Sequence, residues 1–295
     1  MAAESAWPVT GLTAADERSP EQSAQQPAQQ TAQLPRVCYK RGEAPTTSRD
    51  QVAVEAPLGI AYAGQQGEPQ PVTSLLRTPG DDVALTAGFL FAEGQLRRRA
   101  DLDWMHYCVE EDTIQVRGKP APRSIPRMEL THAGCGGCSL RELTRLYPHL
   151  APVQGVNAQG KPAEDLLELA RAIAERVQDQ PREQPLFAAT GGSHAAFVYN
   201  ARGEPLAGGE DIGRHNALDK AIGRLWLDER LHQARIAWVS GRLGFELAQK
   251  SINAGIQALV SVGAPSSLAL ELAHQYKLVA FAFSRKGSFN FYPPV

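Results

Sequence analysis

The second half of the chain alternates short apolar runs with amphipathic helical patterns, and this order constrains the fold more than any other feature. Apolar runs typical of strands lie at residues 195–199, 236–240, 257–262 and 278–283. Helical patterns lie between or beside them at residues 214–227, 245–254 and 266–276. Strands and helices at this spacing favour βαβ units, in which helices cover the faces of a sheet. We therefore predict an α/β fold for residues 140–295.

The first half has a different pattern, which favours an α+β subdomain over residues 36–130. Strand-like runs at 51–60 and 71–79 precede a helical pattern that begins after Asp81 or Asp82 and ends at Gly94. Either aspartate is a residue type that caps helices, and glycine is typical of a helix end. A second pair of strands is expected within residues 103–130.

Two further segments are predicted from composition and periodicity. Residues 1–35 are rich in Gln, Ala and Pro, and such a segment buries too little apolar surface to offset its ordering entropy, so we expect a disordered tail. Apolar residues at 166, 169, 170, 173 and 177 recur with helical spacing and predict an amphipathic helix that ends before Pro181.

Charge and hydropathy narrow the possible partners and location of the chain. Its 295 residues carry a formal net charge of −2 and no long run of Lys or Arg, so we expect no nucleic-acid partner. No run approaches 18 apolar residues, and the N-terminus does not resemble a signal peptide. We therefore expect a cytoplasmic protein without a membrane span.

Residues 131–139 contain Cys135 and Cys138 in a C-x-x-C spacing filled by glycines only. Glycines permit backbone conformations closed to other residues and shield neither sulfur, so a flexible loop with accessible thiols is expected. Two such thiols can share a metal, form a disulfide, or act as nucleophile and resolving partner. A reducing compartment makes a disulfide framework with Cys38 and Cys108 improbable and favours metal or catalytic use.

The surrounding residues do not by themselves decide between these uses. A zinc deaminase would need an H-x-E or usable C-x-E motif ahead of the C-x-x-C, and none is present. A second C-x-x-C, which a four-cysteine zinc site needs, is missing as well, and no aromatic residue or proline flanks the motif as in a thioredoxin-like site. Redox or transfer chemistry and a metal role both remain open at this point.

Three glycine-containing segments follow strands or precede helices in the second half. They are residues 190–194, residues 208–216 and Ser240-Gly241-Arg242. Glycines at such boundaries can let a phosphate approach the backbone, and Arg242 could pair with it, but glycine pairs also mark ordinary tight turns. None of the segments matches a G-x-G-x-x-G or G-x-x-x-x-G-K-[ST] nucleotide motif.

Taken together, the ordered motifs of residues 52–292 resemble the FdhD family, the sulfur carriers required for formate dehydrogenase activity. The motifs are Glu55-Ala56-Pro57-Leu58, Thr78-Pro79, Gly88-Phe89-Leu90, the Cys135–Cys138 loop, Thr190–His194, Glu210–Lys220, Ser240-Gly241-Arg242, Ala264-Pro265-Ser266, and Phe283-x-Arg285 with Asn290 and Tyr292. The resemblance implies a mixed sheet flanked by helices, similar to cytidine deaminases but without their zinc chemistry, and a homodimer.

The resemblance also implies a reaction. A family member accepts persulfide sulfur from a cysteine desulfurase and passes it to the molybdenum cofactor, bis-molybdopterin guanine dinucleotide, before that cofactor enters formate dehydrogenase. Cys135 is then the persulfide carrier. The cofactor is implied to contact the segment Phe283, Ser284, Arg285, Lys286, Gly287 and Ser288, for which GDP is a mimic. Ser288 departs from the basic residue common in the family near this position.

Two hypotheses follow for the loop. Delivery of the outer persulfide sulfur as a sulfido ligand needs two electrons, which Cys138 could supply by closing a disulfide onto Cys135. The alternative is a cofactor-binding chaperone that transfers no sulfur and in which the cysteines only anchor the cofactor or sense redox state. Activation of formate dehydrogenase by single cysteine variants separates the two.

Overall fold

The computed structural model describes residues 29–64, 67–119, 144–145, 147–178 and 184–293. The predicted loop at 131–139, with Cys135 and Cys138, lies outside these residues. Most of the tail predicted at 1–35 lies outside them as well.

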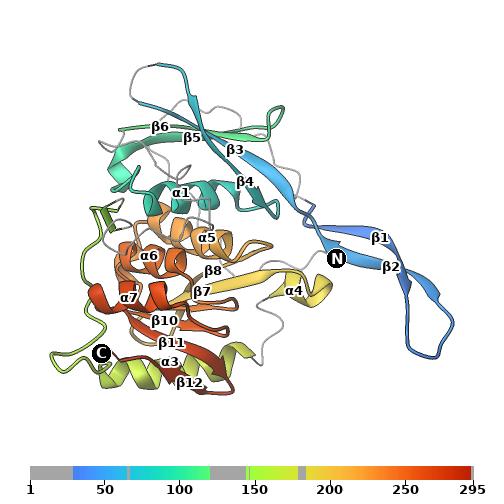
Figure 1. The fold of residues 1–295 in the computed structure, drawn as a ribbon. Coiled ribbons are helices and arrows are strands. Elements are labelled where there is room, and N and C mark those ends of the chain that lie inside the picture. The colour runs from blue at the N-terminus through green and yellow to red at the C-terminus, as the bar shows by residue number, and fades with distance from the viewer. Residues whose placement is uncertain (1–28, 65–66, 120–143, 146, 179–183, 294–295) are drawn as a thin grey trace.

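The larger part of the molecule is built on a six-stranded sheet with the order β12-β11-β10-β9-β7-β8 (Figure 1). Its strands are β7 (His194–Tyr199), β8 (Pro205–Asp211), β9 (Ile236–Val239), β10 (Ala258–Ser261), β11 (Val279–Arg285) and β12 (Ser288–Phe291). Strands β9, β10 and β11 are parallel, whereas β7 is antiparallel to β8 and β9, and β12 is antiparallel to β11. The predicted α/β class and mixed sheet are confirmed, and the likeness to cytidine deaminases stays a prediction.

Helices cover both faces of this sheet. On one face lie α5 (Arg214–Leu227), α6 (Phe245–Asn253) and α7 (Ser267–Gln275), whose apolar residues share a core with Val239, Leu259 and Ala280. On the other face lies α3 (Glu164–Gln178), which buries Leu166 and Ile173 against aromatic residues of the strands, as its predicted periodicity requires (Figure 1).

The N-terminal part forms a second, four-stranded sheet with the order β4-β3-β6-β5. Its strands are β3 (Ala56–Ala63), β4 (Gln70–Arg77), β5 (Leu102–Cys108) and β6 (Thr113–Gly118). Helix α1 (Asp82–Ala92) lies between this sheet and α5, and it buries Leu85 and Phe89 against both (Figure 1). The predicted α+β character of this part is therefore present.

Helices α1 and α5 cross at two glycines. A Cβ added to Gly88 would stand 2.0 Å from the carbonyl oxygen of Asp219, and one added to Gly223 would stand 1.9 Å from that of Ala84. Neither contact is possible for a residue with a side chain. Glycine at both positions therefore lets the two backbones touch.

The prediction that an aspartate side chain caps α1 is wrong, although an aspartate does occupy the cap position. Asp81 occupies the cap position, with φ 58°, but its side chain makes no capping hydrogen bond. Its carboxylate instead lies 2.5 Å from Arg224, and the carboxylate of Asp82 lies 2.9 Å from Arg77. Ion pairs with neighbouring arginines compete for the oxygens that would have capped the helix.

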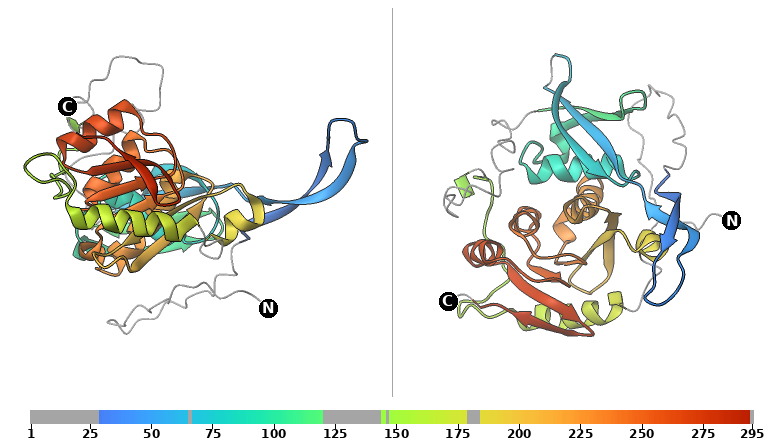
Figure 2. Two further views of the ribbon diagram at one scale, coloured as in Figure 1. Left: turned by 90° about the horizontal axis from the view of Figure 1, so that it is seen from below. Right: turned by 45° about the vertical axis from the view of Figure 1, so that its right-hand side comes forward.

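A two-stranded antiparallel arm of β1 (Thr31–Cys38) and β2 (Thr46–Ala53) projects from the body (Figures 1 and 2). The predicted tail therefore ends too late, because residues 31–35 belong to β1. Their backbones pair in register with β2 from Thr31 opposite Ala53 to Cys38 opposite Thr46, and this pairing does not require apolar side chains.

The sequence patterns miss three other elements. Strand β8 contains Gly208 and Gly209, which were expected at an element boundary but lie inside the strand. A Cβ on Gly209 would stand 2.5 Å from the carbonyl oxygen of Ala217, so this glycine allows β8 to pack against α5. Strand β12 and the short helix α4 (Pro185–Thr190) were also not predicted. Short 3-10 helices at Arg99–Asp101 and Leu231–Gln233 complete the described elements.

Candidate functional site

A cavity of about 1020 Å³ lies at the end of the large sheet where the parallel strands β9, β10 and β11 finish. Carboxyl ends of parallel strands are the usual location of ligand sites in open α/β sheets. The cavity is lined by Gln184, Phe187, Gly191, Gly192, Ser193, His194, Trp238, Ser240, Val262, Arg285, Lys286 and Ser288. Three of the segments singled out in the sequence, 190–194, 240–242 and 283–288, thus contribute to one cavity.

The predicted cofactor-contacting segment forms the turn between β11 and β12. Lys286 and Gly287 have φ values of 48° and 75°, as a two-residue hairpin turn with primed geometry requires. Arg285, Lys286 and Ser288 line the cavity. Gly287 completes the turn beside Glu175 of α3, whose carboxylate would meet a Cβ at 2.6 Å.

Two residues of this segment have other environments. The Ser284 side chain is fully buried and does not line the cavity. Phe283 is 46% exposed, has φ 57°, and does not line the cavity either. A bulky residue in the left-handed region is strained, and such strain is concentrated at functional sites.

The segment Thr190–His194 is held by a carboxylate from β8. Glu210 accepts hydrogen bonds from the backbone N–H groups of Leu186 and Phe187, at 2.9 and 3.0 Å, and from the hydroxyl of Ser193. Burial raises the pKa of Glu210, whereas the two backbone donors act in the opposite direction. The carboxylate thus fixes the first turn of α4 and the wall of the cavity that follows it.

His194 lies at the cavity wall where β7 begins. Its Nδ1 is 3.2 Å from the hydroxyl of Ser240, and that hydroxyl also accepts the backbone N–H of Ala195 at 3.0 Å. Burial lowers the pKa of His194, and the charges of Arg214 and His215 lower it further. The imidazole is therefore held largely neutral near pH 7.

The first turn of α5 brings further positive charge close to His194. A Cβ on Gly241 would stand 3.1 Å from the side chain of Arg214 and 3.5 Å from Nδ1 of His194, so the glycine makes room for both. His215 pairs with Glu246 of α6 at 2.9 Å. Arg242, proposed from sequence as a phosphate contact, is exposed and does not line the cavity.

Comparison with known proteins assigns the chain to a family. Residues 53–294 match the model of the FdhD/NarQ family. The chain belongs to this family.

Relatives in the FdhD/NarQ family are similar along most of their length. Proteins named "Sulfur carrier protein FdhD" from Mycobacterium tuberculosis and Mycobacterium bovis are each 36% identical over 273 residues, which cover 87% of this chain and 95% of theirs. The relative of the same name from Saccharolobus solfataricus is 35% identical over 245 residues, which cover 82% of this chain and 89% of its own.

A solved structure shares the fold. The crystal structure of a proposed formate dehydrogenase accessory protein from Desulfotalea psychrophila superposes with a TM-score of 0.67 and 24% identity, over 90% of this chain and 98% of that one. The sheet arrangement described above therefore agrees with an experimental structure.

In this FdhD/NarQ member the motif 210–220 is largely structural. Lys220 is fully buried, with Nζ 2.8 Å from Asp211 and hydrogen-bonded to the carbonyl oxygens of Thr78 and Glu210. Asp211 also accepts the backbone N–H of Thr78 and the side-chain amide of Asn216. This ion pair ties the small N-terminal sheet to the large one, and Gly208 and Gly209 are buried inside β8.

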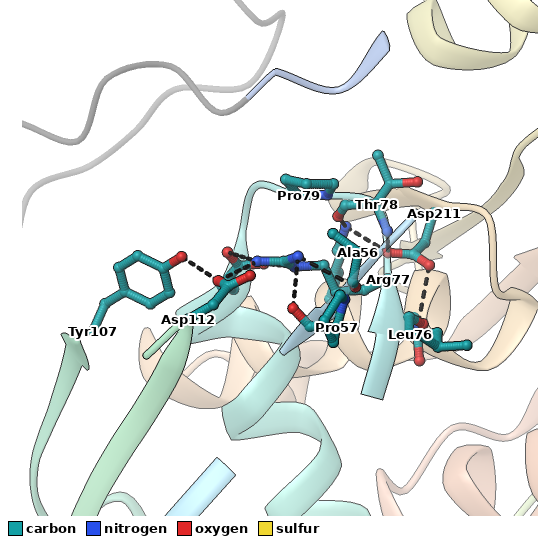
Figure 3. Close-up of polar contacts among 12 residues, drawn as sticks. Ala56, Pro57, Leu76, Arg77, Thr78, Pro79, Tyr107, Asp112 and Asp211 are labelled. Carbon is teal, nitrogen blue, oxygen red and sulfur yellow. Dashed lines mark hydrogen bonds and ion pairs between the residues drawn. The ribbon is translucent and has the colours of Figure 1, made fainter. Parts of the chain in front are cut away.

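The sequence patterns did not predict the hydrogen bonds and ion pairs of Arg77, which lies next to Thr78. Figure 3 shows Arg77 between Asp112 and the backbone of Ala56 and Pro57, with Asp211 beside Thr78. Arg77 is 2% exposed, and its pKa is raised by hydrogen bonds and charge from Asp82 and Asp112, which outweigh burial. The one signal in the sequence was the Thr78-Pro79 motif that follows it.

The predicted catalytic residues Cys135 and Cys138 lie outside the described residues, so the structure does not relate them to the cavity. Within the described ranges, no group of three His, Cys, Asp or Glu side chains could hold a metal ion. No helix in the part of the chain that the structure describes is long and apolar enough to cross a membrane.

Proposed function

We propose that the chain is a sulfur carrier that serves formate dehydrogenase. It takes persulfide sulfur from a cysteine desulfurase onto Cys135 and transfers it to bis-molybdopterin guanine dinucleotide before this cofactor enters the enzyme. The observation that carries the proposal is the convergence of segments 190–194, 240 and 283–288 on one cavity. The names of the relatives, sulfur carrier protein FdhD, support the sulfur chemistry.

The cavity has the size and charge that one nucleotide end of the cargo requires. Its volume of about 1020 Å³ is at the upper end for small-molecule sites, and a nucleoside diphosphate fits within it. Arg285 and Lys286 bring positive charge to the cavity wall, where they would bind the diphosphate. Exposed backbone at Gly191 and Gly192 allows close approach of the ligand.

The transfer consists of two sulfur exchanges. In the first, the thiolate of Cys135 attacks the outer sulfur of the desulfurase persulfide, forming a Cys135 persulfide and releasing the desulfurase thiolate. In the second, the thiolate of Cys138 attacks the inner sulfur, closing a Cys135–Cys138 disulfide and releasing the outer sulfur as sulfide to the cargo. Cys138 supplies the two electrons, and a cellular thiol must reduce the disulfide before the next cycle.

Mass spectrometry and enzyme activation test this proposal together. After incubation with desulfurase and cysteine, the wild type should gain one sulfur atom on Cys135, and a Cys135→Ala variant should neither gain it there nor activate formate dehydrogenase. A Cys138→Ala variant should carry the persulfide but deliver sulfide only with added reductant. Many turnovers by that variant without reductant would remove the resolving role of Cys138.

The chaperone alternative gives the opposite result in the same assay. If the protein only binds and protects the cofactor, a variant with both cysteines replaced by alanine will still activate formate dehydrogenase. Activation by that double variant would therefore refute sulfur transfer while leaving cofactor binding in place.

A further inference from the structure

We infer that Phe187 is the platform on which the purine base of the bound nucleotide stacks. This inference rests on the proposed function, because the ligand class comes from it. It adds a base-recognition residue outside the segment 283–288.

Phe187 and Phe283 are the most exposed phenylalanines among the described residues. Phe89, Phe197 and Phe281 are at most 1% exposed, whereas Phe187 is 48% exposed and lines the cavity. Burial of a large apolar ring in a core contributes roughly 1.5–3 kcal/mol, and a ring left in solvent does not gain this free energy. An exposed ring at a cavity wall is thus available to cover a ligand.

The backbone that carries Phe187 is held at both ends of α4. The two oxygens of Glu210 accept the N–H groups of Leu186 and Phe187, at the start of the helix. At its end, the N–H of Gly191 donates to the carbonyl oxygen of Phe187 at 2.7 Å, and the hydroxyl of Thr190 donates to that of Leu186 at 2.8 Å. A backbone held at these points fixes where the side chain begins and so lowers the ordering cost on binding.

The other aromatic residues nearby are poorer platforms. Trp238 lines the cavity but is 3% exposed, and its ring already stacks on Phe197, with ring centroids 5.9 Å apart and an interplanar angle of 30°. Phe283 is exposed but does not line the cavity. Among the described residues that line it, Phe187 alone offers a half-exposed aromatic ring.

The combination of an aromatic ring with cations identifies the ligand chemistry. Arg285 and Lys286 line the same cavity and suit a diphosphate, while an aromatic face suits a flat base. Stacking on an aromatic side chain grows with the area of the base, so a purine gains more than a pyrimidine. The cavity should therefore prefer GDP to CDP, which share the same ribose diphosphate.

Calorimetric titration of the full-length protein with GDP and with CDP tests the inference. Phe187→Ala should weaken GDP binding about tenfold and CDP binding less, so that the preference for GDP shrinks. Phe187→Trp, which keeps a large aromatic face, should retain GDP affinity. Tyr39→Ala, which truncates an exposed aromatic residue on the arm, should leave both affinities unchanged.

Other results of these titrations would overturn the stacking role of Phe187, alone or together with the assignment of the cavity. Equal losses for GDP and CDP, or no loss, in Phe187→Ala would overturn the stacking role but leave the proposed function standing. Failure of Phe187→Trp to retain GDP affinity would also overturn it. Absence of GDP binding to the wild type would overturn both the stacking role and the assignment of the cavity to the nucleotide, while persulfide formation on Cys135 would remain a separate test of sulfur transfer.

Discussion

The buried ion pairs between the two sheets and the exposed cations at the cavity use the same residue types for opposite purposes. Lys220 and Lys250 are at most 1% exposed, and each lies within 2.8 Å of a buried aspartate, Asp211 or Asp219. Arg285 and Lys286 are exposed at the end of the sheet. Position in the fold, and not the motif in which a charge occurs, separates the structural charges from those that a ligand can reach.

The buried and the exposed charges should also contribute differently to the stability of the protein. Removal of one partner of a buried pair leaves a charge without compensation in a medium of low dielectric, which is costly. Removal of an exposed charge costs little stability, because water already solvates it. Stability and ligand affinity should therefore respond to different residues.

The largest expected effect is a loss of stability in Lys220→Met. The variant leaves Asp211 buried without its cationic partner, and the free energy of unfolding should fall by about 3–5 kcal/mol. Urea denaturation followed by circular dichroism measures it. Arg285→Ala serves as the control and should change the same free energy by less than about 0.5 kcal/mol. Similar stability losses in the two variants would break the contrast between the two sets of charges.

The second-largest expected effect is a loss of GDP affinity in Arg285→Ala. Arg285→Ala should weaken GDP binding by about 10- to 150-fold, because a charge-assisted contact to a phosphate contributes roughly 1.5–3 kcal/mol when it is partly desolvated. Titration calorimetry measures the change, and Arg230→Ala, at a position shortly after α5 that does not line the cavity, is a control. Unchanged affinity in Arg285→Ala would remove this residue from the site.

The smallest effect is a pH dependence at His194, which lies at the cavity wall. Its pKa is lowered from 6.5 in the folded protein, by burial first and by Arg214 next, so the unfolded chain binds more protons between the two pKa values. The stabilising contribution is therefore present above about pH 6.5 and is lost as the pH falls through the folded pKa.

Urea denaturation at about pH 7.5 and about pH 5.5 measures this dependence. The loss of stability on acidification should be smaller in His194→Asn than in the wild type, and His232→Asn, at an exposed histidine, should not change it. Some dependence should persist in His194→Asn, because burial also lowers the pKa of His149. An unchanged dependence would show that His194 does not titrate differently on folding.

The sequence predicted the parts of the fold whose periodicity matches their burial. Helices α3, α5 and α6 and strands β9 to β11 carry clean apolar patterns and lie where they were expected. Strand β8 was missed because the pair Gly208-Gly209, of which Gly209 allows α5 to pack closely, resembles a turn. Strand β1 was missed because an arm held by backbone pairing needs no apolar alternation.

The candidate site was predicted in part. Segments 190–194 and 283–288 could be identified from residue type and family resemblance, but their meeting at one cavity depends on strand order, which no local pattern contains. Phe187 was missed because an isolated phenylalanine beside Leu186 resembles any core residue. Its exposure is a property of the folded chain alone.

The crossing of α1 and α5 at Gly88 and Gly223 has a consequence for how the molecule moves and assembles. At this crossing the backbones of the two helices are in direct contact, and no side chain lies between them that could change rotamer to accommodate a movement. The interface between the N-terminal part and the larger part should therefore resist both hinging and sliding. Neither half should therefore persist as an independent folded fragment.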